Sequence, residues 1–383
     1  MKEIIFLDNA STTKIYNQVN DLIYKTNIDD FYNPSALYHQ SVIIQQKIEN
    51  ATKTVADALK VNAKNIIFTS GATEANNLAI LGSYTANKQA EYIFSSGEHP
   101  SVYNTAKALE QKGCKVNFVK LLPNGLVDIE HLKSLLNVNT HFVSIMYVSN
   151  ETGAINNIEE ISSIIKNFNS KIIIHVDGVQ AFGKLKTDIE KLNIDAFTIS
   201  AHKFKGPKGI GALYYKNLNQ LKTQIFGGGQ QQNLRSGTEN VSGIMGMALA
   251  TQLSQQNLKT NFENATTCKN YLINYINQNL TNVDFEINGE NTSPYITSIS
   301  FKGLKSEVLM HMFEEDGLIV GTGSACSSKK QQNRVLENMN KKPEYIKGNI
   351  RISFSFDTTL EDVKKASEIL VKNVLKLKNQ IQK

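Results

Sequence analysis

Short apolar runs alternate with amphipathic stretches from about residue 40 to residue 215. Between residues 44 and 59, apolar side chains recur every three or four positions, which predicts a helix with one buried face. Buried strands are predicted at NIIFTS (65–70), EYIFSS (91–96), KVNFVK (115–120), HFVSIMYV (141–148), KIIIHVD (171–177), DAFTIS (195–200) and IGALYY (210–215). Polar helical stretches lie between several of these runs. The alternation predicts an α/β domain whose mostly parallel sheet is covered by helices on both faces.

The pattern changes after about residue 250. The predicted elements are a polar helix over 251–280, strands VDFEIN (283–288) and PYITSISF (294–301), a helix near 304–316, a strand RISFSF (351–356) and a final helix over 360–381. We therefore expect a large α/β domain over residues 14–250. A smaller α+β domain is expected over 251–383 together with 1–13.

The composition is that of an ordinary globular protein, with 41% hydrophobic and 20% charged residues. The net charge of +6 comes from lysines spread along the chain, so direct binding of nucleic acid is not expected. The apolar run near the N-terminus is too short for a secretory signal, and no apolar stretch is long enough to span a membrane. These features predict a cytoplasmic protein without a membrane partner.

The three cysteines, Cys114, Cys268 and Cys326, lie far apart and form no CxxC pair. This spacing predicts neither a zinc site nor a disulfide framework, and we expect no metal. An odd number of cysteines fits a reducing compartment, where a free thiol persists and is available for chemistry.

The segment TSGATEANN (69–77) passes from a predicted strand into a predicted helix. Small residues at this point let backbone N–H groups approach an anion, the helix dipole favours negative charge, and Thr73 adds a hydroxyl. A phosphate group suits such a site. An ordinary Ser or Thr cap of the helix explains the same residues equally well.

Two further groups follow predicted strands. Asp177, in HVDGVQ, ends a predicted strand. A carboxylate at this place points into the ligand crevice of an α/β sheet and can hold a cationic ring nitrogen. Alternatively, Asp177 only caps the turn that follows. Lys203, in ISAHKFKGPKG, follows another strand, where a lysine with a lowered pKa can form a Schiff base with an aldehyde. Lys205 and Lys208 are rival lysines, but their position at a Gly-Pro turn predicts that both are exposed to solvent.

The stretch GTGSACSS (321–328) places Cys326 among glycines and small polar residues. A structural cysteine is usually buried among apolar side chains. This setting instead predicts an exposed, ionisable thiol on a loop that can enter and leave a site.

Together these motifs resemble those of the cysteine desulfurases of the NifS/IscS-like group, which are class V aminotransferase-like, fold-type I enzymes that use pyridoxal 5′-phosphate (PLP). The resemblance spans nearly the whole chain, and the motifs in order are LDNASTT (7–13), NPSALYH (33–39), TSGATEANN (69–77), EHPSV (98–102), SNETG (149–153), HVDGVQ (175–180), AHKFKGPKG (201–209), GGGQQQNLRSGTEN (227–240), GTGSACSS (321–328) and RISFSF (351–356). So many motifs in one order are far more specific than any one of them.

The resemblance implies a role for each matching residue. Lys203 would bind the cofactor aldehyde, Asp177 would pair with the pyridine nitrogen, Gln180 would hydrogen-bond the phenolic oxygen, and His99 would stack on the ring and shuttle protons. The phosphate would be bound by Ala72, Thr73, Ser200 and His202, and by Thr238 of a neighbouring subunit in a homodimer. Arg351, helped by Asn150, would hold the substrate carboxylate.

The resemblance also implies a reaction. Cys326 would take sulfur from L-cysteine as a persulfide, L-alanine would be released, and the persulfide would pass to an acceptor protein, either an iron–sulfur scaffold or a tRNA-thiolating enzyme. Three alternatives stay open on the sequence: a selenocysteine lyase, an aminotransferase, and a non-catalytic docking subunit of a sulfur-trafficking complex. The joint presence of Lys203, Asp177, His99, Arg351 and Cys326 disfavours the last.

The chain departs from the family pattern in two places. Gly178 follows Asp177 where the family commonly has alanine, whose methyl group packs beneath the cofactor ring, so we expect one contact to be missing. The segment after the loop cysteine, SSKKQQNRVLENMN (327–340), is more polar and basic than in many relatives, which indicates that the sulfur acceptor differs.

Overall fold

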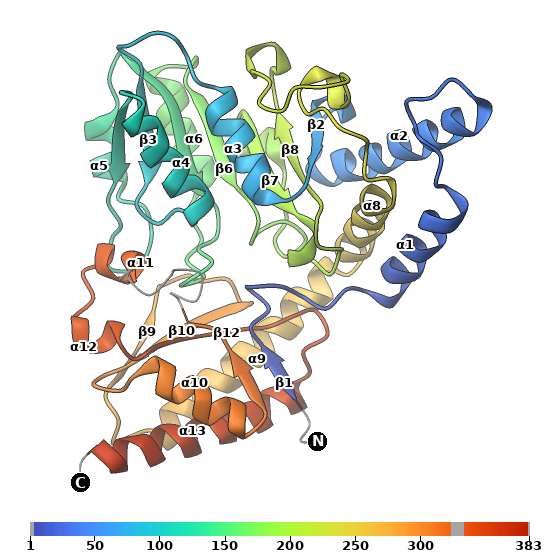
Figure 1. Ribbon diagram of the computed structural model, residues 1–383. Coiled ribbons are helices and arrows are strands. Elements are labelled where there is room, and N and C mark those ends of the chain that lie inside the picture. Colours follow the sequence, from blue (N-terminus) through green and yellow to red (C-terminus); the bar gives the residue numbers. More distant parts are fainter. Residues whose placement is uncertain (1–3, 323–332, 382–383) are drawn as a thin grey trace.

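The computed structural model describes residues 4–322 and 333–381. Its centre is a seven-stranded sheet (Figure 1). In spatial order the strands are β2 (Ile66–Thr69), β8 (Gly211–Tyr215), β7 (Ala196–Ser200), β6 (Ile173–Asp177), β5 (Thr140–Met146), β3 (Glu91–Ser95) and β4 (Lys115–Val119). The strands from β7 to β4 pair in parallel, whereas β8 is antiparallel to both of its neighbours. All seven strands coincide with predicted runs, so the prediction of a mostly parallel sheet is confirmed.

Helices cover both faces of this sheet. One face packs against α2 (His39–Leu59), α6 (Ile158–Phe168) and α8 (Val241–Gln256), and the other against α3 (Ala72–Gly82) and α4 (Pro100–Gln111). Neighbouring residues of one strand serve opposite faces: in β6, Ile174 and Val176 join the first cluster and Ile173 joins the second. Because both faces are buried, each central strand has a continuous apolar run rather than an alternating one.

A second apolar core lies below the large sheet in Figure 1. It is formed by the antiparallel strands β9 (Phe285–Asn288), β10 (Ile296–Phe301) and β12 (Asn349–Ser353), the helices α9 (Leu258–Asn279), α10 (Ser306–Glu315) and α13 (Leu360–Ile381), and the parallel pair of β1 (Ile5–Leu7) with β11 (Leu318–Val320). The N-terminal strand therefore packs with the C-terminal part of the chain. The division into domains of 14–250 and of 251–383 with 1–13 stays a prediction.

The single helix predicted over 251–280 is wrong, because α8 ends at Gln256 and α9 begins at Leu258, with Asn257 between them. The remaining elements are α1 (Asn17–Asp29), α5 (Ile129–Leu135), α7 (Ile189–Leu192), α11 (Arg334–Asn338), α12 (Pro343–Ile346) and the short 3₁₀ turns η1 (Ala63–Asn65), η2 (Ala201–Lys203), η3 (Leu218–Gln220) and η4 (Gln231–Asn233).

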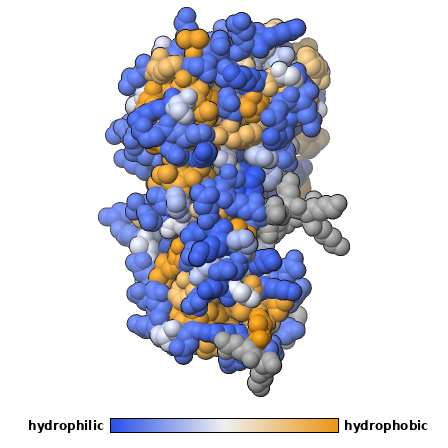
Figure 2. Space-filling view, turned by 90° about the vertical axis from the view of Figure 1, so that its left-hand side faces the viewer, coloured by the Kyte–Doolittle hydropathy of each residue, from blue (hydrophilic) through white to orange (hydrophobic). Residues whose placement is uncertain are grey.

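Figure 2 views the molecule from the side of α5, α11 and α12 in Figure 1. Hydrophilic residues predominate on this face, and hydrophobic ones gather in its upper and lower parts. Within residues 4–322 and 333–381, no helix has the length and apolar character needed to cross a membrane.

Candidate active site

The carboxyl ends of the central strands meet at a cavity of about 520 Å³. Such a volume is typical of a site for a small ligand, and this edge of an α/β sheet is where ligands bind. Of the predicted site residues, the cavity is lined by Ala72, Thr73, His99, Asn150, Asp177, Gln180, Ser200, His202, Lys203 and Arg351. The structure thus brings together ten residues that the sequence places on six separate segments.

Asp177, at the end of β6, lies at the base of the cavity with only 4% of its surface exposed. Its carboxylate accepts hydrogen bonds from Asn76 Nδ2 at 2.9 Å and from the backbone N–H of Val179 at 3.0 Å. Both donors are neutral, and none of the ion pairs among the described residues includes Asp177, which suits a carboxylate that pairs with a cationic group in the cavity.

His99 caps the start of α4 beside Asp177. Its Nδ1 accepts a hydrogen bond from the backbone N–H of Ser101 at 3.2 Å and lies 2.8 Å from Ser101 Oγ. Because Nδ1 is the acceptor, the neutral ring carries its proton on Nε2. Burial lowers the pKa of His99, and the charge of Asp177 offsets part of that effect. The ring is therefore neutral at pH 7, with an Nε2–H group that can donate a hydrogen bond or a proton.

The N-terminus of α3 forms one wall of the cavity. The helix begins at Ala72, and the N–H groups of its first turn have no partner within the helix. Gly71 (φ 157°) precedes it. A Cβ atom on Gly211 would lie 2.8 Å from the Gly71 backbone, so a glycine at 211 lets the strand and the turn approach closely. The predicted anion site at this wall stays a prediction.

Ser200 and His202, which the sequence predicts as part of the same anion site, line the cavity at the end of β7. His202 Nδ1 lies 3.2 Å from Thr12 Oγ1. Burial, together with the nearby lysines Lys203, Lys208 and Lys184, lowers the pKa of His202 to about 4. The ring is thus a neutral hydrogen-bonding group at pH 7.

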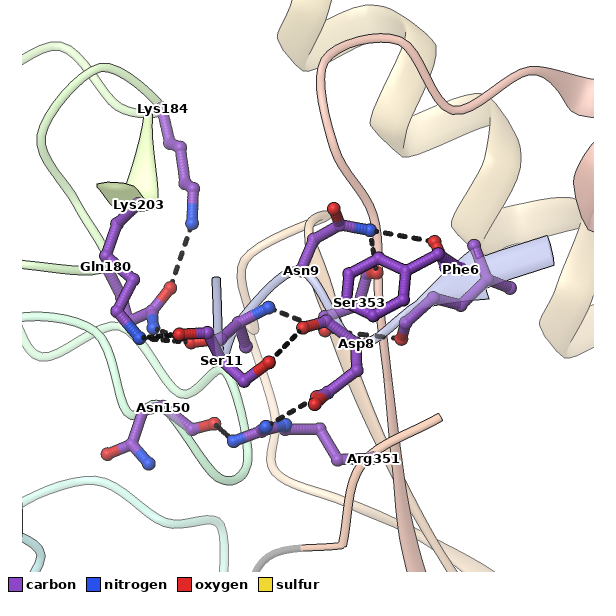
Figure 3. Close-up of polar contacts among 12 residues, drawn as sticks. Phe6, Asp8, Asn9, Ser11, Asn150, Gln180, Lys184, Lys203, Arg351 and Ser353 are labelled. Atoms are coloured by element: carbon purple, nitrogen blue, oxygen red, sulfur yellow. Dashed lines mark hydrogen bonds and ion pairs between the residues drawn. The ribbon is translucent and has the colours of Figure 1, made fainter. Parts of the chain in front are cut away.

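Lys203 lies in η2, directly after β7, and its Nζ donates to the backbone oxygens of Ala10 at 2.6 Å and Ser11 at 2.7 Å (Figure 3). Gln180 Nε2 donates to the same oxygen of Ala10 at 2.8 Å, and Gln180 Oε1 accepts from Lys184 Nζ at 2.9 Å. The segment after β1 therefore holds the amine of Lys203 and the amide of Gln180 side by side.

Arg351 reaches the cavity from β12, opposite Lys203. Its Nη2 forms an ion pair with Asp8 Oδ1 at 2.7 Å, and its Nη1 donates to the backbone oxygen of Asn150 at 2.8 Å (Figure 3). Its Nε is buried and has no hydrogen-bond partner in the described part of the chain. The guanidinium is thus fixed at one end and retains an unused donor.

Gly321 is part of this arrangement. Two backbone hydrogen bonds, of 2.9 and 2.7 Å, join it to Arg351. A Cβ atom at Gly321 would lie 2.4 Å from Asp8 Oδ1 and 2.9 Å from Arg351 Nη2. A glycine is therefore required here to leave room for the Asp8–Arg351 ion pair.

Two predicted site residues lie elsewhere. Thr238 is exposed and lines a separate surface groove with residues of the α1–α2 connection, so it does not reach the cavity of its own chain. Cys326 lies outside the residues that the structure describes. The described residues on either side of that gap approach the site, since Gly321 is bonded to Arg351, and Arg334 donates to the backbone oxygens of Ser96 and Glu98, next to His99.

One expectation from the sequence is wrong. Lys205 is buried rather than exposed, because its Nζ forms an ion pair with Asp357 at 2.5 Å and lies 4.6 Å from the centre of the Tyr16 ring. A Cβ atom at Gly178 would lie 1.9 Å from the ring of Phe197, so that ring occupies the position of a methyl group at residue 178. The loss of one contact beneath the cofactor ring stays a prediction.

Sequence reasoning missed Asp8, Lys184 and the backbone of Ala10 and Ser11 as parts of the site. Asp8, Ala10 and Ser11 belong to LDNASTT, a motif that resembles the family but to which the sequence assigned no role. Lys184 gave no signal, because a lysine that follows a glycine is most often a surface residue.

Residues 5–366 match the family model described as "Aminotransferase class-V". The chain is 34% identical to a protein of Dictyoglomus turgidum named "Cysteine desulfurase IscS", over 99% of this chain and 96% of that protein. A solved structure named "NIFS-LIKE PROTEIN" has a TM-score of 0.91 at 30% identity and covers 98% of this chain and all of its own. Another, titled "SspA in complex with cysteine", has a TM-score of 0.78 at 29% identity, covering 92% and 99%.

These similarities extend over nearly the whole length of each protein, so they include both the sheet and the C-terminal core. They agree with the family to which the motifs point. The chain therefore belongs to the class V aminotransferase family, and within it to the cysteine desulfurases.

Proposed function

We propose that the protein is a PLP-dependent cysteine desulfurase that converts L-cysteine to L-alanine and transfers the sulfur to Cys326. One observation supports this above all others. A single cavity joins an amine (Lys203), a buried carboxylate (Asp177), a neutral imidazole (His99) and a partly unsatisfied guanidinium (Arg351). An amino-acid substrate and an aldehyde cofactor need these four groups together.

The residues of the cavity fit PLP. We assign the aldehyde to Lys203, the ring nitrogen to Asp177, the phenolic oxygen to Gln180 Nε2, and the phosphate to the first turn of α3 with Thr73, Ser200 and His202. The buried carboxylate of Asp177 accepts its hydrogen bonds from two neutral donors, so a protonated ring nitrogen would be a suitable charged partner. When bound, PLP supplies an electron sink for the pair released at the substrate Cα.

We assign substrate binding, proton transfer and sulfur transfer to residues of the chain. Arg351 binds the substrate carboxylate through the donors that Asp8 and Asn150 leave unused, and the Asn150 side chain assists. Lys203 and the neutral ring of His99 move protons near Cα. The thiolate of Cys326 attacks the substrate sulfur: an S–S bond forms, the C–S bond breaks, and its electron pair stays on the carbon fragment, which takes up protons and leaves as alanine.

The persulfide on Cys326 is then available to an acceptor protein. We propose an iron–sulfur scaffold or a tRNA-thiolating enzyme as that acceptor. We also propose a cytoplasmic location, because a persulfide and the free thiols of Cys114 and Cys268 persist only in a reducing compartment.

Treatment of the holoenzyme with L-cysteine tests the function. We expect alanine to appear and the mass of Cys326 to rise by one sulfur atom. Parallel assays with L-selenocysteine and with a keto-acid acceptor address the lyase and aminotransferase alternatives. Amino-group transfer without any persulfide would contradict the proposal.

The ion pair of Arg351 leads to a prediction about substrate binding. Arg351→Lys removes the planar two-pronged donor, so we expect KM for L-cysteine to rise about 10- to 100-fold, the effect of losing one charged hydrogen bond. The measurement is KM and kcat for L-cysteine and for cysteamine, which lacks the carboxylate. Cysteamine should be affected little, and an equal loss for both substrates would remove Arg351 from carboxylate binding.

We further propose that the protein is a homodimer. The α1–α2 region carries large apolar side chains that are mostly exposed in a single chain, with Leu37 fully so, Phe31 70% and Tyr24 69% exposed. Monomeric proteins rarely expose so much apolar surface in one region. Thr238 lines a groove beside this region. We assign Thr238 of each chain to the phosphate site of its partner in a dimer formed through this surface.

A charge in this surface should weaken the dimer. We expect the double variant Leu37→Asp, Phe31→Asp to show about half the molar mass of the unmodified protein in light scattering and to lose activity, because each site would lack the partner's Thr238. Val138→Asp is the matched control, since Val138 is 88% exposed and follows α5, on the other side of the molecule (Figure 1). An unmodified protein that is fully active as a monomer would overturn the proposal.

A further inference from the structure

Lys184 is a buried lysine at the active site to which the proposed reaction gives no role. It lies in the turn after β6 with 2% of its surface exposed. Among the ion pairs of residues 4–322 and 333–381, none includes Lys184. A lysine is seldom buried without a carboxylate, because removing its charge from water is costly. Its position therefore requires an explanation.

The contacts of Lys184 point to Gln180. Lys184 Nζ donates to Gln180 Oε1 at 2.9 Å (Figure 3). It also lies 5.8 Å from the centre of the Tyr295 ring. A side-chain amide can present either its oxygen or its NH₂ group to a neighbour. Lysine has only donors, so it can bind only the oxygen. Lys184 thus favours the orientation in which the oxygen of the Gln180 amide faces it.

The other end of the amide faces Lys203. Gln180 Nε2 donates to the backbone oxygen of Ala10 at 2.8 Å, and Lys203 Nζ donates to that same oxygen at 2.6 Å. The NH₂ group is therefore held beside the amine that binds the cofactor. If the amide were reversed, its oxygen would face the oxygen of Ala10 and the two acceptors would repel each other.

The positive charge of Lys184 also affects the protonation of Lys203. Burial, with the cations Lys203 and Arg351, lowers the pKa of Lys184 to about 7. The effect is reciprocal, since a charged Lys184 disfavours a proton on the Lys203 nitrogen. His202, the other titratable group affected by Lys184, is neutral at pH 7.

We propose that Lys184 is a positioning residue that fixes the Gln180 amide with its NH₂ group toward Lys203 and the phenolic oxygen of the cofactor. This inference rests on the proposed function, because it assumes that the cofactor is bound to Lys203. It explains why a lysine is buried where an apolar side chain would be the more stable choice.

The test is a pH titration of the visible absorbance of the lysine-bound cofactor in Lys184→Met. Met keeps most of the length of the side chain and lacks both the charge and the donors. Without a fixed donor, the phenolic oxygen holds more negative charge and favours a proton on the Lys203 nitrogen. We expect the titration midpoint to rise by about one pH unit and the cofactor to dissociate about tenfold more readily.

The same substitution in a variant that lacks the Gln180 amide shows whether Lys184 acts through Gln180. In Gln180→Leu the midpoint should also rise. Adding Lys184→Met should then raise it further by clearly less than Lys184→Met does alone, because only the direct charge effect of Lys184 on Lys203 is left. Lys205→Met is the control for loss of a buried lysine, since Lys205 is paired with Asp357 and lies outside the cavity lining. It should leave the midpoint unchanged.

The outcomes separate this inference from the proposed function. The melting temperature of the cofactor-free Lys184→Met protein should stay equal or rise. A lower melting temperature with an unchanged midpoint would make Lys184 merely structural and overturn the inference. If borohydride reduction of the unmodified holoenzyme does not label Lys203, it is the proposed function that fails.

Discussion

Replacing Cys326 by serine is expected to lower the release of alanine from L-cysteine by about 100-fold or more and to abolish persulfide formation. A serine hydroxyl is far less nucleophilic than a thiolate at neutral pH, so it cannot attack the substrate sulfur. The variant should still bind its cofactor and L-cysteine, because the residues assigned to both lie in the cavity. The measurements are alanine release, persulfide mass, and the change of the cofactor's visible absorbance on adding L-cysteine.

The described residues near Cys326 support this expectation. Cys326 is four positions after Thr322, and four residue-to-residue steps span at most about 14 Å. Thr322 follows Gly321, which is bonded to Arg351. A thiol so connected can reach a substrate whose carboxylate is held by that arginine.

The other two cysteines provide matched controls. Cys268 is fully buried in the C-terminal core, and Cys114 lies between α4 and β4, away from the cavity lining. Burial raises the pKa of both thiols, which makes them weaker nucleophiles at pH 7. Cys114→Ser should keep persulfide formation. If Cys326→Ser instead turns L-cysteine over at the unmodified rate, Cys326 is not the sulfur acceptor and the desulfurase function must be abandoned.

The central sheet could be predicted because its signal is local. Each strand from β2 to β8 is a short apolar run, and burial on both faces produces such a run without any knowledge of its neighbours. The site residues at the strand ends followed from the same logic, since Asp177 and Ser200 are the last residues of β6 and β7. Their convergence is a consequence of parallel strands sharing one edge.

Contacts between distant segments could not be predicted in this way. Strands β1 and β11 have three residues each and pair across about 310 positions of sequence, so neither shows a periodic pattern of its own. The ion pair of Asp8 with Arg351 spans a similar separation. Nothing in either local sequence indicates that the two side chains meet.

The wrong prediction for Lys205 has the same origin. Lys205 follows a pattern typical of a solvent-exposed turn, yet Asp357, more than 150 residues later, provides the partner that allows its burial. Similarly, the ring of Phe197, from the next strand of the sheet, occupies the Cβ position at Gly178. The local sequence shows the charge of Lys205 and the small size of Gly178, but the residues that pack against them are known only from the fold.

Lys203→Ala should eliminate the covalent attachment of the cofactor. The amine of Lys203 is held in the cavity by the backbone oxygens of Ala10 and Ser11, beside Gln180 and opposite Arg351. Without it the cofactor has no covalent anchor, and the amine that assists proton transfer at Cα is lost as well. We expect the rate of alanine release to fall about 10²- to 10⁴-fold, the range for loss of a general acid–base group.

Borohydride reduction followed by peptide mapping identifies the attached lysine. The adduct should be on Lys203 in the unmodified protein and absent in Lys203→Ala, whereas Lys208→Ala, which alters an exposed lysine at the rim of the same cavity, should keep it. Lys205 is unsuitable because Asp357 holds its amine, and Lys184 because its amine is bound to Gln180. An adduct on Lys184, Lys205 or Lys208 of the unmodified protein would therefore refute both the assignment of Lys203 and the arrangement of the cavity around it.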